Sequence, residues 1–238
     1  GCRPSIILLN FPINPASQNW ALKNMQGAVY STPNARSETS DRSGAPTPFP
    51  HKKASQMAKE LTEQDRASAA DMIARARAAM AEIEDWSQAD LDRLSQAIAW
   101  YAGNEATFTR LAEQGVDESG IGDRAGRPAK RFKIQMVLRD VLRTPSTGVV
   151  EVDEVKGLVK YAKPAGVIAS LIPMTNPAMT PPVTGVSSAN ARNAVIFSPH
   201  PRTAGTTFEM VEMMRKACVA VGAPADLFQA VRYPSIPL

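Results

Sequence analysis

The chain has 238 residues, enough for one large domain or two ordinary ones. Hydrophobic residues make up 44% of it and charged residues 21%, a composition that excludes full-length disorder and a collagen-like fibre. Its two cysteines, Cys2 and Cys218, cannot form a disulfide framework. This favours a reducing compartment such as the cytoplasm, or indifference to redox conditions.

The net positive charge of the chain lies in its N-terminal quarter. Residues 1–56 hold six of the 27 basic side chains and two of the 23 acidic ones, so they carry the entire net charge of +4. They also hold seven of the 19 prolines and show no sustained periodicity. We predict a disordered or non-native extension before a natural start at Met57. The alternative, a basic tail that binds nucleic acid, would show strongly salt-dependent binding.

Residues 60–143 are predicted to form a helical layer. Thr62–Asp65 and Ser87–Asp90 resemble capping boxes in which Asp replaces the usual Glu or Gln. Two further helices are expected over residues 105–114 and 128–143. The apolar residues that follow the two boxes at helical spacing are Ile73, Ala76, Met80 and Ile83, then Leu91, Leu94, Ile98 and Tyr101.

After Pro145 the sequence pattern changes from helix to strand. Residues 147–162 predict a strand pair around a polar turn. Three apolar runs follow, at residues 166–172, 194–197 and 227–231, and they are typical of strands buried on both faces. A helix over residues 203–221 lies between the last two. Residues 165–231 therefore predict a β-α-β-α-β unit, and the fold class is α/β: a helical layer followed by part of a parallel, Rossmann-like sheet.

Residues 164–191 form an uncharged run of 28 residues. A membrane span is excluded because five prolines and two asparagines interrupt the run. It predicts instead a buried strand that opens into a proline-shaped turn near residues 173–182.

The carboxyl ends of the first two strands are the candidate binding site, because ligands of open parallel sheets bind there. These ends are Pro173–Pro177 and Ser198–Arg202, which are rich in small polar groups and prolines and precede predicted helices. No glycine-rich dinucleotide fingerprint and no phosphate-loop lysine motif follows the first strand. The pattern alone leaves two interpretations open, a nucleotide-sized ligand or two loops shaped only for packing.

Other reactive residues are interpreted as structural. His200 is the only histidine after residue 56, so no metal site is expected, and it is interpreted as a hydrogen-bonding loop residue. Cys218 falls on the apolar stripe of the helix over residues 203–221, which indicates a core thiol rather than a nucleophile. A local basic run indicates a solvated face or a subunit contact, since no aromatic platform for nucleic acid accompanies it. Its members are Arg127, Lys130, Arg131 and Lys133.

Several motifs of the chain occur together in a known order. They are Asp-Glu-Ser-Gly-Ile-Gly at residues 117–122, Thr-Asn-Pro at 175–177, Arg-Asn-Ala-x-Ile-Phe-Ser-Pro-His-Pro at 192–201 and Gly-Ala-Pro at 222–224. In this order and spacing they resemble the CoA-acylating branch of the aldehyde dehydrogenase superfamily. The resemblance implies that residues 57–238 are the N-terminal part of an NAD(P)-binding domain.

The resemblance also implies a reaction. An NAD(P)-dependent enzyme of this kind oxidises a short aldehyde, such as acetaldehyde or sulfoacetaldehyde, to its acyl-CoA. A cysteine thiolate attacks the carbonyl, hydride passes to the nicotinamide and coenzyme A takes up the thioester. The full-length form is expected to be a homo-oligomer without nucleic-acid or membrane partners. The implied cofactor-binding residues are Ile172, Pro173, Met174, Thr175 and Asn176 near the nicotinamide half, and Ser198, Pro199, His200, Pro201 and Arg202 near the adenosine ribose.

The chain departs from the family pattern at its catalytic groups. The family's nucleophile lies downstream of Leu238, and Cys218 does not match it, so we expect a fragment that is inactive alone. In the non-acylating branch the oxyanion asparagine follows Pro-Trp; without a gap Thr175 takes that place, and Asn176 comes one residue later. Asn176 is the predicted oxyanion donor. The alternative is a non-catalytic nucleotide-binding or regulatory module.

Overall fold

The computed structural model describes residues 62–232 and residue 234. The predicted extension over residues 1–56 and the predicted start at Met57 lie outside these residues, and both stay predictions.

Both predicted capping boxes start helices. Helix α2 (Glu63–Glu82) begins after Thr62, whose hydroxyl accepts from the backbone N–H of Asp65 at 3.1 Å, while the Asp65 carboxylate accepts from the N–H of Thr62 at 3.0 Å. Helix α3 (Gln88–Gly103) begins after Ser87 with the same pair of bonds to Asp90. Asp serves in place of Glu because its carboxylate reaches the same N–H group.

Helix α4 (Glu105–Ser119) continues past the predicted end at residue 114. The prediction stopped it before Gly115, but the helix ends at Gly120, whose φ of 68° lies in the left-handed region that glycine adopts freely. The predicted helix over residues 128–143 consists of two parts, a 3₁₀ helix η2 (Arg127–Arg131) and helix α5 (Phe132–Val141).

Two separate sheets follow. Strands β1 (Gly148–Asp153) and β2 (Leu158–Ala162) form an antiparallel ribbon. The larger sheet is parallel, in the order β3-β4-β5, with helices α6 and α7 between successive strands. This confirms the predicted β-α-β-α-β unit and the α/β fold class. Its elements are β3 (Val167–Ile172), α6 (Thr180–Asn190), β4 (Ala194–Pro199), η3 (Pro201–Thr203), α7 (Ala204–Ala220), η4 (Ala225–Leu227) and β5 (Phe228–Ala230).

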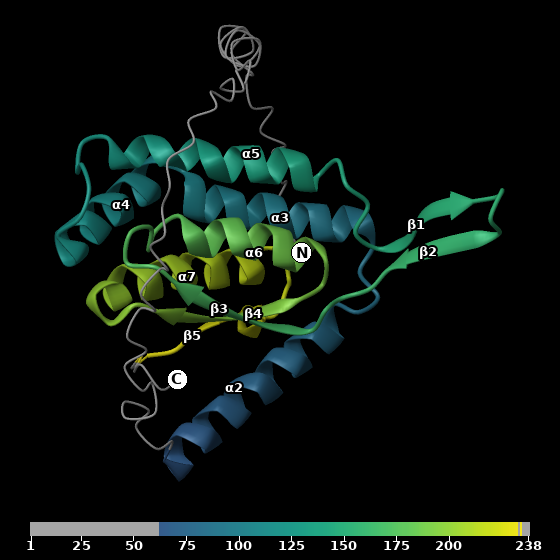
Figure 1. Cartoon of the computed structure of the whole chain (residues 1–238), viewed down its shortest axis with the longest axis horizontal. Coiled ribbons are helices and arrows are strands. Elements are labelled where there is room, and N and C mark those ends of the chain that lie inside the picture. Colours follow the sequence, from purple (N-terminus) through teal and green to yellow (C-terminus); the bar gives the residue numbers. More distant parts are fainter. Residues whose placement is uncertain (1–61, 233, 235–238) are drawn as a thin grey trace, which may run out of the picture. The chain divides into compact units, whose positions relative to one another are not determined.

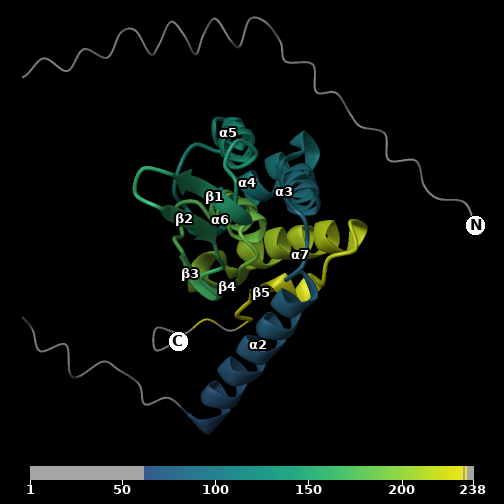
Figure 2. The ribbon, with the colours of Figure 1, turned by 90° about the vertical axis from the view of Figure 1, so that its right-hand side faces the viewer.

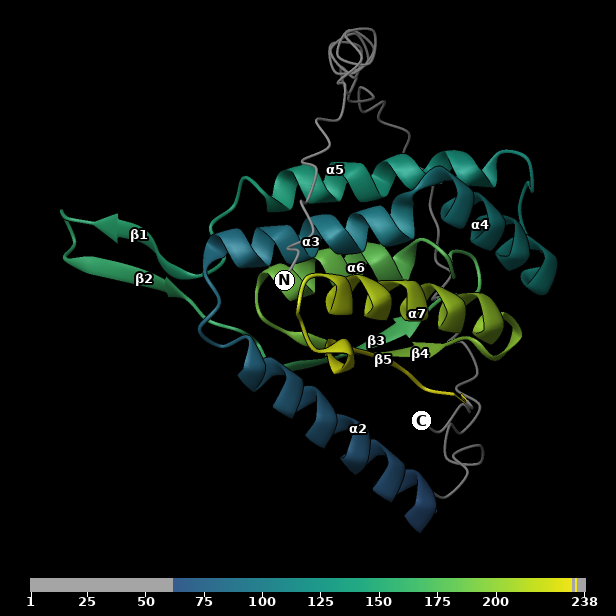
Figure 3. The ribbon, with the colours of Figure 1, turned by 180° about the vertical axis from the view of Figure 1, so that it is seen from behind.

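Helices cover both faces of the three-stranded sheet. Helix α2 lies on one face, and α6 and α7 cover the other (Figures 1 and 3). Helix α3 packs on the outer side of α6 and α7, and α5 packs against α6 and α3. The core between the layers includes Phe197 and Phe228, both fully buried, whose ring centroids are 6.2 Å apart. The β1–β2 ribbon projects away from these layers (Figure 1).

Two apolar positions of the predicted elements are exposed. Ile73, which the sequence placed on the apolar face of α2, is 37% exposed, and the buried residues of this helix are Ala76 and Ala79. The N-terminal end of α2 extends away from the sheet (Figure 2). Leu171 of β3 is 76% exposed, so the prediction that residues 166–172 are buried on both faces is wrong. In the described part of the chain β3 pairs with β4 alone, whereas β4 pairs with a strand on each side and is largely buried.

None of the helices in residues 62–232 is long and apolar enough to cross a membrane. The uncharged run of residues 164–191 forms β3, the turn that follows it and α6.

Candidate functional site

The two predicted site loops lie side by side. Strands β3 and β4 are parallel and in register to their ends, where Ile172 pairs with Pro199. The backbone N–H of His200 donates to the carbonyl oxygen of Ile172 at 3.1 Å and continues the ladder into the loops. Residues 173–177 and 198–202 therefore meet at the carboxyl edge of the sheet, as the sequence predicted.

The loop after β4 mixes buried and exposed residues. Pro199 is buried, Ser198 is half-buried, and Pro201 and Arg202 are exposed. The Nδ1 atom of His200 accepts from the backbone N–H of Arg202 at 3.2 Å and caps the 3₁₀ helix η3. His200 thus forms a hydrogen bond within its loop, as its interpretation as a loop residue predicts, and its contact with a cofactor stays a prediction.

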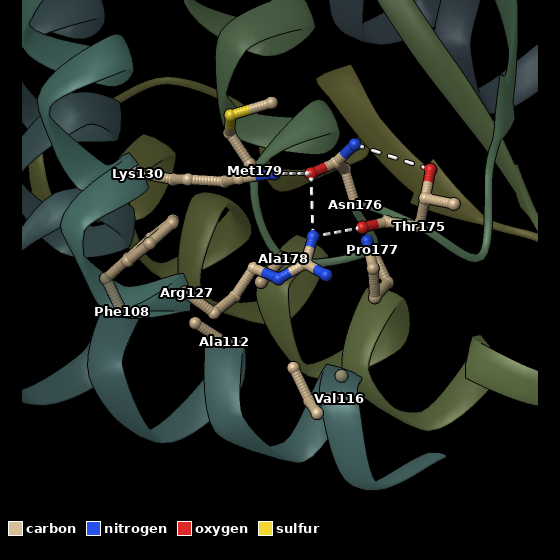
Figure 4. Close-up of a pocket in the computed structure, with 11 residues that line it drawn as sticks. Phe108, Ala112, Val116, Arg127, Lys130, Thr175, Asn176, Pro177, Ala178 and Met179 are labelled. Carbon is tan, nitrogen blue, oxygen red and sulfur yellow. Dashed lines mark hydrogen bonds between the residues drawn. The ribbon is translucent and has the colours of Figure 1, made fainter. Parts of the chain in front are cut away.

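The loop after β3 presents Asn176 to two cations. The Oδ1 atom of Asn176 accepts from Nζ of Lys130 at 2.9 Å and from Nη1 of Arg127 at 3.2 Å (Figure 4). Arg127 also donates to the carbonyl oxygens of Thr175 at 2.6 Å and of Ile121 at 3.1 Å. The amide nitrogen of Asn176 faces the other way, toward the Thr175 hydroxyl at 3.4 Å. In the same loop Ile172 and Pro177 are buried, Met174 and Asn176 are half-buried, and Pro173 and Thr175 are exposed.

The space between this turn and its supports is small. Residues of α4 and η2 surround it on one side and residues 175–179 on the other (Figure 4). Its free volume of about 10 Å³ has room for about one water molecule. Arg127 and Lys130 therefore contact the turn on the side that faces α4 and η2, and the space there is too small to hold a substrate.

The predicted role of the basic run needs correction. The interpretation as a solvated face is wrong for Arg127 and Lys130, which reach the Asn176 turn. Arg131 pairs instead with Glu105 at 3.3 Å, and Lys133 is exposed. Arg127 and Lys130 are three residues apart, a spacing that places them on one side of the 3₁₀ helix η2 and would also do so in an α-helix. The spacing was therefore a signal that the two side chains act together, but the sequence did not show that the Asn176 turn lies against them.

Glu118 connects the end of α4 to the first turn of α7. Its two carboxylate oxygens accept from the backbone N–H of Thr206, each at 3.1 Å, in the first turn of α7. A carboxylate at a helix N-terminus satisfies a free N–H group and interacts favourably with the helix dipole. Glu118 therefore anchors the start of α7, the helix that directly follows residues 198–203.

Cys218 is confirmed as a core residue. Its side chain is fully buried in α7, and burial raises the pKa of the thiol to about 12, against a smaller opposing effect of Arg215. The thiolate is the nucleophilic form of cysteine. Among the described residues Cys218 is the free cysteine, and it cannot act as the nucleophile at neutral pH.

Iodoacetamide is expected to leave Cys218 unlabelled at pH 8 in the native chain. The raised pKa lowers its thiolate fraction about a thousandfold relative to an ordinary cysteine, and burial blocks access. Mass spectrometry of the peptide that contains Cys218 measures the labelling, and the same chain in denaturant is the control and should label. Native labelling at the rate of a free cysteine would contradict the core assignment.

Gly115 is expected to be necessary for the packing of the Asn176 turn. A β-carbon at this buried position of α4 would lie 2.8 Å from Cγ of Pro177, in a ring that cannot rotate away. Gly115→Ala should lower the free energy of unfolding by about 1 kcal/mol, because overlap costs about 1–3 kcal/mol and helix propensity returns about 1 kcal/mol. Gly115→Val should lower it further. Chemical denaturation tests this, and a stabilised alanine variant would contradict it.

Comparison with known proteins gives the family. The model described as "Aldehyde dehydrogenase family" matches residues 41–235, a segment that includes both site loops and begins upstream of Met57. The chain belongs to the aldehyde dehydrogenase family. Its relatives place it in the CoA-acylating branch of that family.

Three relatives illustrate this placement. The chain is 38% identical over 167 residues to a sulfoacetaldehyde dehydrogenase from Acholeplasma sp, a match that covers 70% of this chain and 34% of the relative. It superimposes with a TM-score of 0.69 on an acetylating aldehyde dehydrogenase from Geobacillus thermoglucosidasius, at 29% identity, covering 73% of this chain and 38% of that one. A propionaldehyde dehydrogenase from Rhodopseudomonas palustris, with bound CoA and an acylated cysteine, gives a TM-score of 0.57 at 28% identity, covering 70% and 38%. The chain spans about a third of the length of the curated relatives it matches.

Proposed function

We propose that the chain supplies part of the cofactor-binding domain of a cytoplasmic, NAD(P)-dependent, CoA-acylating aldehyde dehydrogenase. The observation that carries this proposal is the similarity to CoA-acylating relatives. The family match extends over both loops at the carboxyl edge of the sheet. The substrate is a short aldehyde and the product its acyl-CoA. The complete enzyme is a homo-oligomer that also contains the nucleophilic cysteine.

Asn176 has the role of oxyanion donor in this proposal. A thiolate that attacks an aldehyde carbonyl forms a carbon–sulfur bond and leaves negative charge on the oxygen. The Nδ2 group of Asn176 can donate to that oxygen, because its Oδ1 is already occupied by Lys130 and Arg127. A preorganised donor of this kind stabilises the transition state without reorganisation during the reaction.

The two loops have groups that suit a dinucleotide. Exposed Thr175 and Arg202 and half-buried Ser198 present hydroxyl and guanidinium groups at the sheet edge, where ligands of parallel sheets bind. Residues 172–176 would hold the nicotinamide half and residues 198–202 the adenosine ribose. When bound, the nicotinamide supplies the acceptor for the hydride that leaves the substrate carbon.

The isolated chain is expected to be inactive as an aldehyde dehydrogenase. Cys218 is buried and protonated, so the proposed reaction needs a thiol from elsewhere in the protein. NAD(P)H formation from acetaldehyde or sulfoacetaldehyde in the presence of CoA measures the activity. Turnover by residues 57–238 alone would contradict the assignment of the missing thiol.

A chimaera tests the proposed function directly. The chain is joined to the part of the Acholeplasma sulfoacetaldehyde dehydrogenase that follows the matched segment, and the unaltered relative is the control. We expect CoA- and NAD(P)-dependent oxidation of a short aldehyde. A folded chimaera that binds NAD(P) without turnover would favour the alternative, a nucleotide-binding or regulatory module.

A further inference from the structure

Two cations hold the side-chain oxygen of Asn176. Lys130 and Arg127 approach Oδ1 at 2.9 and 3.2 Å. Both side chains carry donors only, so the atom that faces them has to be the oxygen of the amide. The NH₂ group is therefore directed away from them, toward Thr175 (Figure 4).

This placement of charge is unusual, since both cations contact a neutral oxygen. Neither Arg127 nor Lys130 forms an ion pair with a carboxylate in the described part of the chain. Burial, and then the charges of Arg127 and Lys133, lower the pKa of Lys130. The space behind the turn holds about one water molecule, which is too small for an anionic substrate group.

The guanidinium of Arg127 is itself held in place. It donates to the carbonyl oxygens of Thr175 and Ile121, so it joins the Asn176 turn to the segment after α4. A β-carbon at Gly122 would overlap this guanidinium, and the glycine leaves the space that it occupies. A planar group with donors on two nitrogens fixes direction as well as distance.

We propose that Arg127 and Lys130 are positioning residues that fix the orientation of the Asn176 amide and keep its NH₂ group available as a donor. Without them the amide can rotate by half a turn and present its oxygen, which would repel an oxyanion. The identity of the acceptor as an oxyanion rests on the proposed function. The fixed orientation of the amide is independent of the proposed function, because it follows from the contacts of Lys130 and Arg127 with Oδ1.

The test uses ¹⁵N relaxation of side-chain amides in the full 238-residue chain, without cofactor. The Asn176 signal is identified by its loss in Asn176→Ala. We expect an order parameter near that of rigid backbone, about 0.85, in the unaltered chain and below about 0.6 in the variant that combines Arg127→Met and Lys130→Met. An unchanged order parameter in this variant would overturn the proposal.

Matched variants separate positioning from folding. Lys133→Met removes an exposed charge nearby and should leave the Asn176 order parameter unchanged. Lys130→Arg keeps a cationic donor and should restore most of the order lost in Lys130→Met. If the double variant does not fold, the comparison of Lys130→Met with Lys130→Arg decides, and equal disorder or equal order in the two would overturn the proposal.

The chimaera gives the link to catalysis. There, Lys130→Met should lower kcat with KM for the aldehyde unchanged, because the oxyanion forms only after binding. If the chimaera is inactive while the order parameter still falls in the double variant, the proposed function fails and the positioning of Asn176 stands.

Discussion

Replacing Asn193 by alanine is expected to lower the free energy of unfolding by about 3 kcal/mol. This buried side chain accepts from the backbone N–H of Gly166 at 2.9 Å and donates to the carbonyl oxygens of Ser188 at 3.3 Å and Ala191 at 3.2 Å. It thereby joins the start of β3, the end of α6 and the start of β4. Alanine removes the printed partner of the Gly166 N–H and of the Ala191 carbonyl, while the Ser188 carbonyl still accepts from the backbone N–H of residue 193 at 2.9 Å. Each buried polar group left unpaired costs about 1–3 kcal/mol. Chemical denaturation of the chain measures the change.

Two further variants control this prediction. Gln135→Ala replaces an exposed residue of α5 and should change the free energy of unfolding by less than about 0.5 kcal/mol. Asn193→Asp keeps the acceptor for Gly166 but places a carboxylate against two carbonyl oxygens, so its pKa should rise and the loss should be relieved in acid. An Asn193→Ala variant with an unchanged free energy of unfolding would show that the three bonds do not join these elements.

Asn176→Ala in the active chimaera is expected to lower kcat about 10²- to 10³-fold. The amide is the predicted oxyanion donor, and its orientation is set by Lys130 and Arg127. KM for the aldehyde should change little, since the negative charge develops only in the transition state. Steady-state NAD(P)H formation measures both parameters.

Thr175→Ala is the matched variant for this prediction. Thr175 occupies the place of the oxyanion asparagine in an ungapped comparison with the non-acylating branch, while Asn176 comes one residue later. If Asn176 is the donor, the loss of kcat should be much smaller in Thr175→Ala than in Asn176→Ala. The reverse order would move the oxyanion role away from Asn176.

Much of the fold was predictable because it depends on near neighbours in sequence. The capping boxes at Thr62 and Ser87 join residues three apart, and both form. The apolar run of β4 fits a strand with a neighbour on each side. The meeting of the two site loops was predictable as well, because parallel strands place their carboxyl ends at one edge.

Other features depend on contacts between distant residues. Helix α4 continues through Gly115, where the Pro177 turn packs closely against it, and no local pattern shows this contact. Leu171 is exposed although its run is apolar, because burial depends on which strands and helices become its neighbours. The interpretation of the basic run failed for the same reason, since its contacts lie 46 and 49 residues away at Asn176.

The helical layer, the parallel unit and the family motifs could be predicted from the sequence, because periodicity, caps and motif order are local properties. The contact of Arg127 and Lys130 with Asn176 became visible only in the folded chain. What a side chain contacts depends on backbone geometry and on the element packed against it, and a linear pattern of charges contains neither.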